Sequence, residues 1–279
     1  MSIQLMFITN DREIAKEAQK AGIDRIMVDL EVLGKAERQK RRDTLISCHT
    51  LEDISAMREI VEPGRLMVRI NPIHDQSARE IGEVINRGAD IIMLPMFKTS
   101  GEVSAFLQAV TGRAKTCLLL ETAQAFVRMD EILSLKGIDE VHIGLNDLHL
   151  SLGLDFMFEL LSGGIVEYIC RKLADRGIRY GFGGIAKLGE GLLPAEMILA
   201  EHVRLGSQMV ILSRTFHERA KNLEDIRSRF SLKNEIAKIR NFEKQAIQWT
   251  PGQFADNMQQ IKEKVIQIRD RRGEALSKS

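Results

Sequence analysis

Two carboxylates, Glu121 and Asp147, come at the ends of apolar runs that have the length of β-strands, "TCLLLET" (116–122) and "EVHIGLND" (140–147). If these runs are neighbouring parallel strands, both side chains lie at the same edge of the sheet. Two carboxylates can hold a hard cation such as Mg²⁺, which keeps several waters and takes its other ligands from substrate. Capping of a following helix, or pairing with a basic neighbour, is the alternative for each. Finding both at strand ends favours a metal site.

Arg69 follows another apolar run, in "MVRINP" (67–72). An unpaired guanidinium beside a buried strand is costly to desolvate, so Arg69 needs an anion. Asp29 or Glu31, at the end of the run 25–31, could supply that anion within the protein. Otherwise the planar guanidinium suits bidentate contact with a substrate carboxylate. Both possibilities stay open, and Arg69 and Glu31 are candidate catalytic residues.

Two histidines, His49 in "ISCHT" and His149 in "NDLHL", fall in predicted loops near these strand ends and could transfer protons. A surface or helix-capping role is the alternative for each. His49 completes the set of candidate catalytic residues. A glycine-rich segment, "GFGGIAKLGEG" (181–191), could bind a phosphate through backbone N–H groups, although tight turns explain its glycines equally well.

The elements that must position these residues alternate along the chain. Eight apolar runs of strand length recur, and most segments between them have the apolar spacing of amphipathic helices. Continuous apolar strands alternating with helices indicate a parallel sheet covered on both faces. Eight repeats predict a closed (β/α)8 TIM barrel; an open doubly wound sheet usually has fewer strands, and no GxGxxG follows the first run. The runs are 5–9, 25–31, 65–71, 90–97, 116–122, 140–147, 179–185 and 208–216.

The predicted barrel domain occupies residues 1–222, and a charged helical extension follows over 223–279. Apolar residues recur in the extension at helical spacing. Because a closed barrel has no interior place for further helices, these apolar faces should cover the outside of the barrel or a neighbouring subunit. We expect the neighbour, and therefore a homo-oligomer. The apolar residues are Ile226, Phe230, Ile236, Ile239, Phe254, Met258, Ile261, Val265 and Ile268.

The composition argues against several classes of function. Forty basic and thirty-nine acidic residues leave a net charge of +1, so no overall field attracts nucleic acid or an anionic membrane. Three widely spaced cysteines without a CxxC argue against disulfides and a thiolate zinc site, and they indicate a reducing compartment. Nothing in the sequence predicts export or a membrane span. We therefore expect a cytoplasmic protein whose partner is a small molecule.

The order and spacing of these motifs resemble the HpcH/HpaI aldolase and citrate lyase β-subunit family over residues 3–216. The stretches that carry the resemblance are "VDLE" with "GKAERQ", "MVRINP", "GADIIMLPMF", "LLLETAQAF" and "VHIGLNDL". The resemblance implies that Mg²⁺, or another divalent cation such as Mn²⁺, is held by Glu121 and Asp147. It also implies that Arg69 binds the carboxylate of an oxoacid or its CoA ester, and that lyase or aldol chemistry proceeds through an enolate.

Three departures limit how far the resemblance extends. Pyruvate-type aldolases of the family carry a histidine just after the acidic end of the second strand; "DLEVLGKAERQ" has none, so His49 would have to replace that base. Citrate-lyase-like members usually read Leu-Glu-Asp there, and this chain keeps Glu31, Lys35 and Arg38 but has Val32 instead of the aspartate. The charged extension also differs from the closing region of CoA-ester lyases. A non-catalytic or regulatory oxoacid-binding relative, or a phosphoenolpyruvate-using barrel enzyme, is therefore the alternative.

Overall fold

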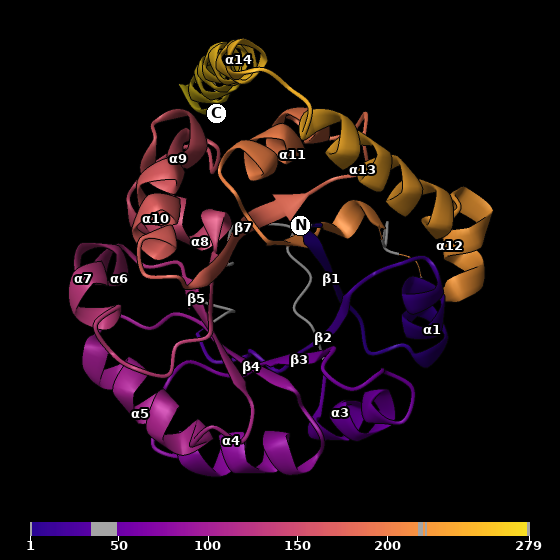
Figure 1. The fold of residues 1–279 in the computed structure, drawn as a ribbon, viewed down its shortest axis with the longest axis vertical. Coiled ribbons are helices and arrows are strands. Elements are labelled where there is room, and N and C mark those ends of the chain that lie inside the picture. Colours follow the sequence, from indigo (N-terminus) through magenta and orange to yellow (C-terminus); the bar gives the residue numbers. More distant parts are fainter. Residues whose placement is uncertain (1, 35–48, 217–219, 221, 278–279) are drawn as a thin grey trace. The chain divides into compact units, whose positions relative to one another are not determined.

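The computed structural model describes residues 2–34, 49–216, 220 and 222–277 of the chain. Eight strands form a closed parallel barrel, in which each strand neighbours the next one in the sequence, and helices surround it (Figure 1). This is the predicted (β/α)8 TIM barrel. Sequential strand order with helices in the connections is the arrangement that alternating apolar runs and amphipathic segments require.

All eight predicted strands are present, inside the predicted runs or one residue outside them. Strands β2, β4 and β6 are buried along their whole length, as expected for parallel strands covered on both faces. The strands are β1 (Gln4–Ile8), β2 (Arg25–Asp29), β3 (Leu66–Arg69), β4 (Ile91–Leu94), β5 (Lys115–Leu120), β6 (Glu140–Ile143), β7 (Arg179–Ile185) and β8 (Met209–Leu212).

Seven predicted helices are also present: α1 (Arg12–Lys20), α3 (Leu51–Arg58), α4 (Ser77–Asn86), α5 (Ser100–Val110), α7 (Met129–Ile132), α10 (Ile165–Ala174) and α11 (Ala195–Arg204). Their caps explain where several begin; the Asp11 side chain, for example, accepts hydrogen bonds from two N–H groups in the first turn of α1. Sequence analysis missed four short elements, because a few residues show too little periodicity. These are α6 (Ala123–Val127), α8 (Leu145–Ser151), α9 (Glu159–Ser162) and the 3-10 helix η1 (Arg214–Phe216).

The register of the parallel strands positions the first candidate residues. Asp29, the last residue of β2, lies opposite Arg69, the last residue of β3. On its other side, Arg69 lies opposite Met93 in β4. Carboxyl ends of parallel strands meet at one edge, so the side chains that follow β2, β3, β4 and β5 in this part of the chain can share a site.

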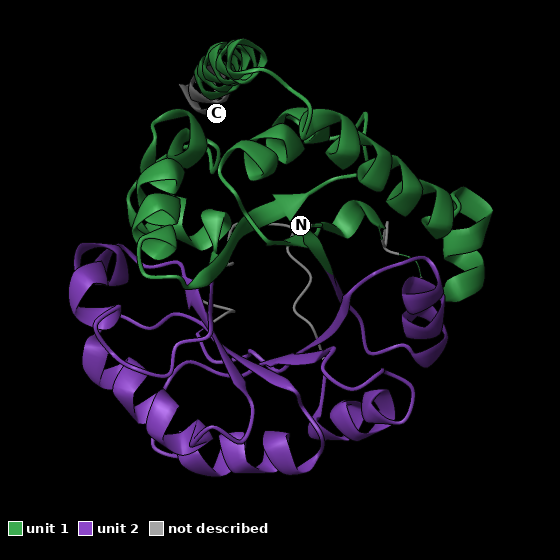
Figure 2. Cartoon of the chain, viewed as in Figure 1, with its two compact units in different colours: residues 1–5, 142–279 green, residues 6–141 purple. Residues whose placement is uncertain are grey.

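The chain divides into two compact units (Figure 2). Unit 1 comprises residues 1–5 and 142–279, and unit 2 comprises residues 6–141. Unit 2 contains the carboxyl ends of β2 to β5, and unit 1 contains β7, β8 and all helices from α8 onward. The predicted domain boundary at residue 222 therefore falls inside unit 1.

The C-terminal extension forms three helices, α12 (Leu223–Arg229), α13 (Leu232–Ala246) and α14 (Pro251–Ser277). Within unit 1, α13 and α14 both pack on α11, and α14 also packs on α9. We expected the apolar faces of the extension to cover a neighbouring subunit. This expectation is wrong for five side chains that are buried within the chain itself. For those on α13 and α14, the reason is that these helices pack on α9 and α11. The five side chains are Ile226, Ile236, Ile239, Ile261 and Val265.

A buried ion pair joins Arg25, the first residue of β2, to Glu140, the first residue of β6. Arg25 Nη1 donates to Glu140 Oε2 at 2.6 Å and Nη2 donates to Oε1 at 2.7 Å. The two side chains are 3% and 1% exposed. Burial alone would lower the pKa of Arg25, but the hydrogen bonds and charge of Glu140 more than offset it and raise that pKa. Each charge therefore depends on the other.

His202 is a fully buried imidazole in α11. Its ring stacks on Phe182 with centroids 3.7 Å apart, and its Nδ1 lies 2.8 Å from Ser207 Oγ. Burial, assisted by the nearby His142, lowers the pKa of His202 to about 3. The folded chain therefore keeps this histidine neutral at pH values where an unfolded chain binds a proton.

We expect His202 to make the protein less stable as the pH falls. Its folded pKa is depressed, so the stability is fully present above about pH 6.5 and is lost below it, by roughly 1 to 2 kcal/mol per pH unit. Denaturant unfolding at neutral pH and at about pH 5 measures this loss. His202→Gln removes the titrating group and should lose about 2 kcal/mol less than the native chain between the two conditions. Equal losses in both proteins would contradict the assignment.

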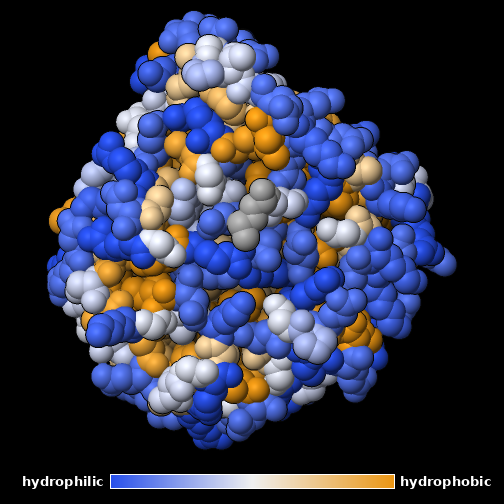
Figure 3. All heavy atoms as spheres, in the orientation of Figure 1, coloured by the Kyte–Doolittle hydropathy of each residue, from blue (hydrophilic) through white to orange (hydrophobic). Residues whose placement is uncertain are grey.

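The polarity of the surface and the burial of two cysteines can be compared with the composition of the chain. Figure 3 shows one face of the molecule, on which hydrophilic residues surround small hydrophobic groups. None of the described helices is long and apolar enough to cross a membrane. Cys117 and Cys170 are buried as expected, and burial raises the pKa of Cys170 to about 12. Cys48 lies outside the described residues.

Candidate active site

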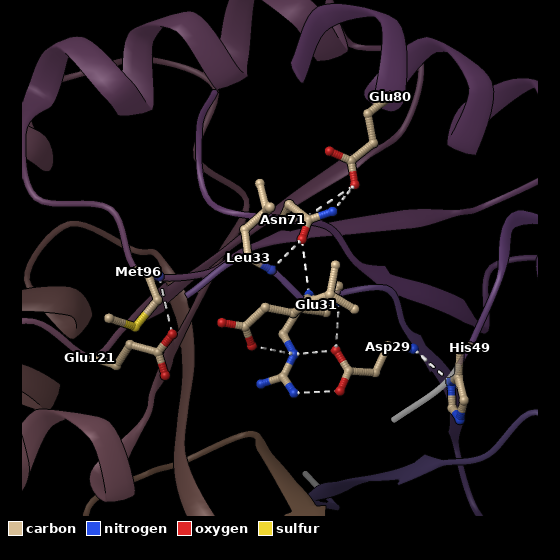
Figure 4. Close-up of polar contacts among 10 residues, drawn as sticks. Asp29, Glu31, Leu33, His49, Asn71, Glu80, Met96 and Glu121 are labelled. Atoms are coloured by element: carbon tan, nitrogen blue, oxygen red, sulfur yellow. Dashed lines mark hydrogen bonds and ion pairs between the residues drawn. The ribbon is translucent and has the colours of Figure 1, made fainter. Parts of the chain in front are cut away.

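Arg69 and Asp29 form an ion pair at the carboxyl ends of β3 and β2, within unit 2 (Figure 4). Arg69 Nε donates to Asp29 Oδ1 at 2.8 Å, and Arg69 Nη2 donates to Oδ2 at 2.7 Å. This is the bidentate geometry in which a guanidinium and a carboxylate match. The internal anion that the sequence allowed for Arg69 is therefore present.

Glu31 extends this cluster. Its Oε2 lies 3.5 Å from Arg69 Nε, and its backbone N–H donates to Asp29 Oδ1 at 3.2 Å. Burial alone would lower the pKa of Arg69, but the negative charges of Asp29, Glu31 and Glu121 more than offset it and raise that pKa above its ordinary value. Three buried carboxylates thus act on one guanidinium, and negative charge exceeds positive charge among these four residues.

The ion pairs of Arg69 use only part of its guanidinium. Its ion pairs use Nε and Nη2, and Nη1 donates to no residue in the part of the chain that the structure describes. The Arg69 side chain is 15% exposed, whereas that of Asp29 is 1% exposed. The Arg69 side chain thus keeps some contact with solvent while it holds its internal partner.

Glu121, a predicted metal ligand, follows β5 in the same unit and is 3% exposed. Its Oε1 accepts a hydrogen bond from the backbone N–H of Met96 at 3.1 Å (Figure 4). Met96 has a φ of 55°, in the left-handed region that residues with a side chain rarely adopt. Because this conformation aims the amide at the carboxylate, Glu121 is held in one orientation inside the protein.

Substitutions at Met96 should report the strain. Glycine adopts the left-handed conformation freely, whereas a β-branched residue there is a pronounced outlier. We expect Met96→Val to be less stable than Met96→Gly by about 1 to 2 kcal/mol in denaturant unfolding. Similar stabilities for the two variants would show that the backbone relaxes at this position without cost.

Asp147, the second predicted metal ligand, belongs to unit 1 and lies in the first turn of α8. Strand β6 ends at Ile143, so the expectation that the strand continues to Asp147 is wrong. The reason is that Leu145 and Leu148 are buried on one face of a helical turn. Asp147 itself is half-buried. No cluster of three or more His, Cys, Asp or Glu side chains suited to a metal ion occurs among the described residues.

The two candidate histidines have other partners. His49 Nδ1 accepts a hydrogen bond from the backbone N–H of Asp29 at 2.9 Å. The lone pair that a general base needs on this nitrogen is therefore engaged, which places the proton of a neutral ring on Nε2 and disfavours His49 as the base. His149 is buried in α8, with Nδ1 3.1 Å from the carbonyl oxygen of Leu145. It is a core residue.

The glycine-rich segment 181–191 comprises the second part of β7 and the turns that follow it. Gly189 donates its N–H to Glu196 Oε1 at 2.6 Å, and Lys187 donates its N–H to Thr215 Oγ1 at 3.1 Å. Two amides that could bind a phosphate thus have protein acceptors. Gly189 also has a φ of 83°, which explains glycine at this position by the turn alone.

Sequence analysis did not identify the polar network that borders the Arg69 cluster. Asn71, Glu80 and His74 are joined by hydrogen bonds beside the loop that follows β2. The only signal in the sequence is that Asn71 stands just past the end of an apolar run. Lys35 and Arg38, part of the motif that resembles citrate-lyase-like proteins, lie outside the described residues.

Comparison with known proteins gives a consistent result. The chain matches the family described as HpcH/HpaI aldolase/citrate lyase over residues 4–157, which is more than half of its length. It is 28% identical over 169 residues to a 2-keto-3-deoxy-L-rhamnonate aldolase of Shigella dysenteriae serotype 1 (strain Sd197). That match covers 50% of this chain and 63% of the aldolase, so the chain spans less than two thirds of its relative.

Solved structures share the fold at lower identity. An HpcH/HpaI aldolase from Desulfitobacterium hafniense DCB-2 is 17% identical with a TM-score of 0.59, over 76% of this chain and 86% of the other. A citrate lyase β subunit from M. tuberculosis, complexed with oxaloacetate and magnesium, is 18% identical with a TM-score of 0.58. That alignment covers 89% of this chain and 98% of the subunit. The similarity to both structures concerns the barrel fold.

Proposed function

Because the chain belongs to the HpcH/HpaI aldolase/citrate lyase family, we propose that it is a carbon–carbon lyase or aldolase. Its substrate is a small oxoacid or the CoA ester of one, and the bond is broken or formed through an enolate. The observation that carries the proposal is Arg69, which Asp29 and Glu31 orient while its Nη1 edge is left for a substrate carboxylate. The aldolase relative and the oxaloacetate-bound citrate lyase subunit support this substrate class.

Glu121 and Asp147 are the residues that we propose as ligands of Mg²⁺, with Mn²⁺ as the alternative cation. Their oxygens suit a hard cation that takes its other ligands from water and substrate. When bound, such a cation supplies Lewis-acid stabilisation of the charge that develops on a carbonyl oxygen.

Arg69 and Glu31 have separate roles in this proposal. Arg69 binds the oxoacid carboxylate and so fixes the position of the reacting carbonyl. Glu31 is the proposed proton carrier, because its carboxylate lies beside Arg69 while the Nδ1 lone pair of His49 is engaged by Asp29.

A non-catalytic oxoacid-binding protein is the second candidate function. Two observations favour it. No histidine comes directly after the acidic end of β2, and the Nδ1 lone pair of His49 accepts a hydrogen bond from the N–H of Asp29. Such a protein would keep Arg69 and the cation site but convert no substrate. A phosphoenolpyruvate-using enzyme is a further alternative, which the occupied amides of segment 181–191 do not favour.

One screen separates these functions. Small oxoacids, their aldol adducts and acyl-CoA esters are incubated with the protein and Mg²⁺, and turnover is followed by release or consumption of the oxoacid. A lyase gives turnover that EDTA abolishes and Mg²⁺ restores. Binding of oxoacids in calorimetry without turnover of any adduct or ester would favour the non-catalytic protein, and phosphate release from phosphoenolpyruvate would favour the third function.

Assembly and location are also proposals. We propose a homo-oligomer in the cytoplasm, supported by the family resemblance and by the large side chains that remain exposed in the extension, such as Ile247 and Ile266. The mass of the full chain in solution tests the first, and a monomer would contradict it.

A further inference from the structure

The side chain of Asn71 bridges two parts of unit 2. Its Oδ1 accepts two hydrogen bonds from the loop that follows β2, one from the N–H of Val32 at 2.9 Å and one from the N–H of Leu33 at 3.1 Å (Figure 4). Its Nδ2 donates to Glu80 Oε1 at 2.9 Å. A carbonyl oxygen accepts two such bonds through its two lone pairs, so the amide is fully used on this side.

Glu80 fixes which way the amide points. On α4, its Oε1 also accepts the backbone N–H of Asn71 at 3.2 Å, and its Oε2 lies 2.9 Å from His74 Nε2. A carboxylate can only accept from Asn71, and the two loop amides can only donate to it. The oxygen of Asn71 therefore faces the loop and its nitrogen faces Glu80.

The loop has little else to hold it at these two residues. Val32 and Leu33 are 50% and 45% exposed, so burial of their side chains contributes little to their position. Glu31, immediately before them, is buried with Oε2 3.5 Å from Arg69 Nε. The N–H of Glu31 donates to Asp29 Oδ1 at 3.2 Å, and the two amides that Asn71 binds hold the backbone on the C-terminal side of Glu31.

We propose that Asn71 is a positioning residue, which holds the loop after β2 so that the Glu31 carboxylate stays beside Arg69. The proposal deepens the proposed function and rests on it for its catalytic consequence. Asn71 itself does not contact the reacting atoms in this view. Its effect passes through the backbone of Val32 and Leu33 to Glu31 and from there to the guanidinium.

The first test is Asn71→Ala. Loss of their shared acceptor, Asn71 Oδ1, should increase hydrogen exchange at the amides of Val32 and Leu33 by about ten-fold or more. The NMR resonance of Arg69 Nε should shift, because Glu31 no longer holds its place beside it. In the active enzyme, kcat/KM should fall about 10- to 100-fold, the scale expected when a site residue is misplaced. The melting temperature should move by only a few degrees, because the side chains of Val32 and Leu33 are exposed.

Reversing the polarity of the bridge is the sharper test. Asn71→Asp keeps an acceptor for the loop but places a carboxylate against Glu80, where the amide now donates at 2.9 Å. This variant should be at least as impaired as Asn71→Ala. Adding Glu80→Gln supplies a donor in place of the second carboxylate, although the backbone N–H of residue 71 then loses the acceptor that Glu80 Oε1 gives it. The double variant should therefore recover part of the loop protection, of the Arg69 resonance and of kcat/KM relative to Asn71→Asp. If Asn71 only stabilises the fold, the Arg69 resonance should stay unmoved in each of these variants.

Arg79→Ala is the matched control on the same helix, since it removes an exposed ion pair with Glu83 and leaves Glu80 in place. It should change none of the readouts. Two results in Asn71→Ala would overturn the proposal, whatever the activity of the variant. One is a rate of hydrogen exchange at Val32 and Leu33 that equals the native rate, and the other is an Arg69 resonance that does not move. If the native protein converts no substrate, the proposed function fails, and the exchange and resonance data still decide the role of Asn71.

Discussion

Replacing Glu121 by Gln is expected to reduce magnesium-dependent turnover by about 100-fold or more while leaving the fold intact. Glutamine keeps the size of the side chain, and its Oε1 can still accept the hydrogen bond that Met96 donates at 3.1 Å. The substitution therefore removes the charge and little else. Turnover with and without EDTA gives one measurement, and Mg²⁺ affinity from calorimetry gives another that does not depend on turnover.

Asp147→Asn should behave in the same way if Asp147 is the second ligand. Its alternative role is to interact with the dipole of α8, whose first turn it occupies, and this is worth at most about 1 kcal/mol at a half-exposed position. That role alone would give a slight loss of stability with native turnover. Glu83→Gln, in an ion pair on the surface of α4, is the control for loss of a carboxylate charge. Native Mg²⁺ affinity and turnover in Glu121→Gln would exclude Glu121 as a ligand.

The second large effect concerns stability: Glu140→Ala should lower the free energy of unfolding by about 3 to 5 kcal/mol. The substitution leaves the guanidinium of Arg25, whose side chain is 3% exposed, without the carboxylate that holds it at 2.6 and 2.7 Å. A buried charge without its partner carries the full cost of desolvation. Urea unfolding followed by far-UV circular dichroism measures the loss.

Replacing both partners separates the ion pair from the volume it fills. Arg25→Met with Glu140→Leu removes both charges and keeps apolar atoms in their place, so most of the stability lost in Glu140→Ala should return. Arg79→Ala, which breaks a surface pair, should cost less than about 1 kcal/mol. If Glu140→Ala costs no more than Arg79→Ala, the guanidinium of Arg25 has found solvent or another anion.

The barrel was predictable because its information is local. Each strand is a short apolar run, and seven connecting helices show the helical period, most of them ending near a glycine. Where the local signal was weak, the prediction failed: Gly144 and the residues after it read as the end of a strand, but Leu145 and Leu148 bury one face of a helix. The prediction for the extension failed for a different reason. An apolar stripe on a helix shows that the face is buried, but it does not identify the surface that covers it.

The site was only partly predictable. Asp29, Glu31, Arg69 and Glu121 stand at strand ends, and the parallel order of the strands is enough to bring the first three together. The sequence did not reveal that Arg69 has an internal partner that uses only part of its guanidinium, since this depends on which nitrogen meets which oxygen. The position of Asn71 between Glu80 and the loop after β2 likewise depends on side-chain orientation, which periodicity does not encode.

The pair of Arg25 and Glu140 also has a kinetic consequence. The two residues are 115 positions apart in the sequence, so their hydrogen bonds form only after a long segment of chain has closed on itself. We therefore expect this contact to form late in folding and to be largely absent from the transition state. Its loss should accelerate unfolding and leave the refolding rate nearly unchanged. The ion pair would then govern how long a folded molecule survives rather than how quickly one is made.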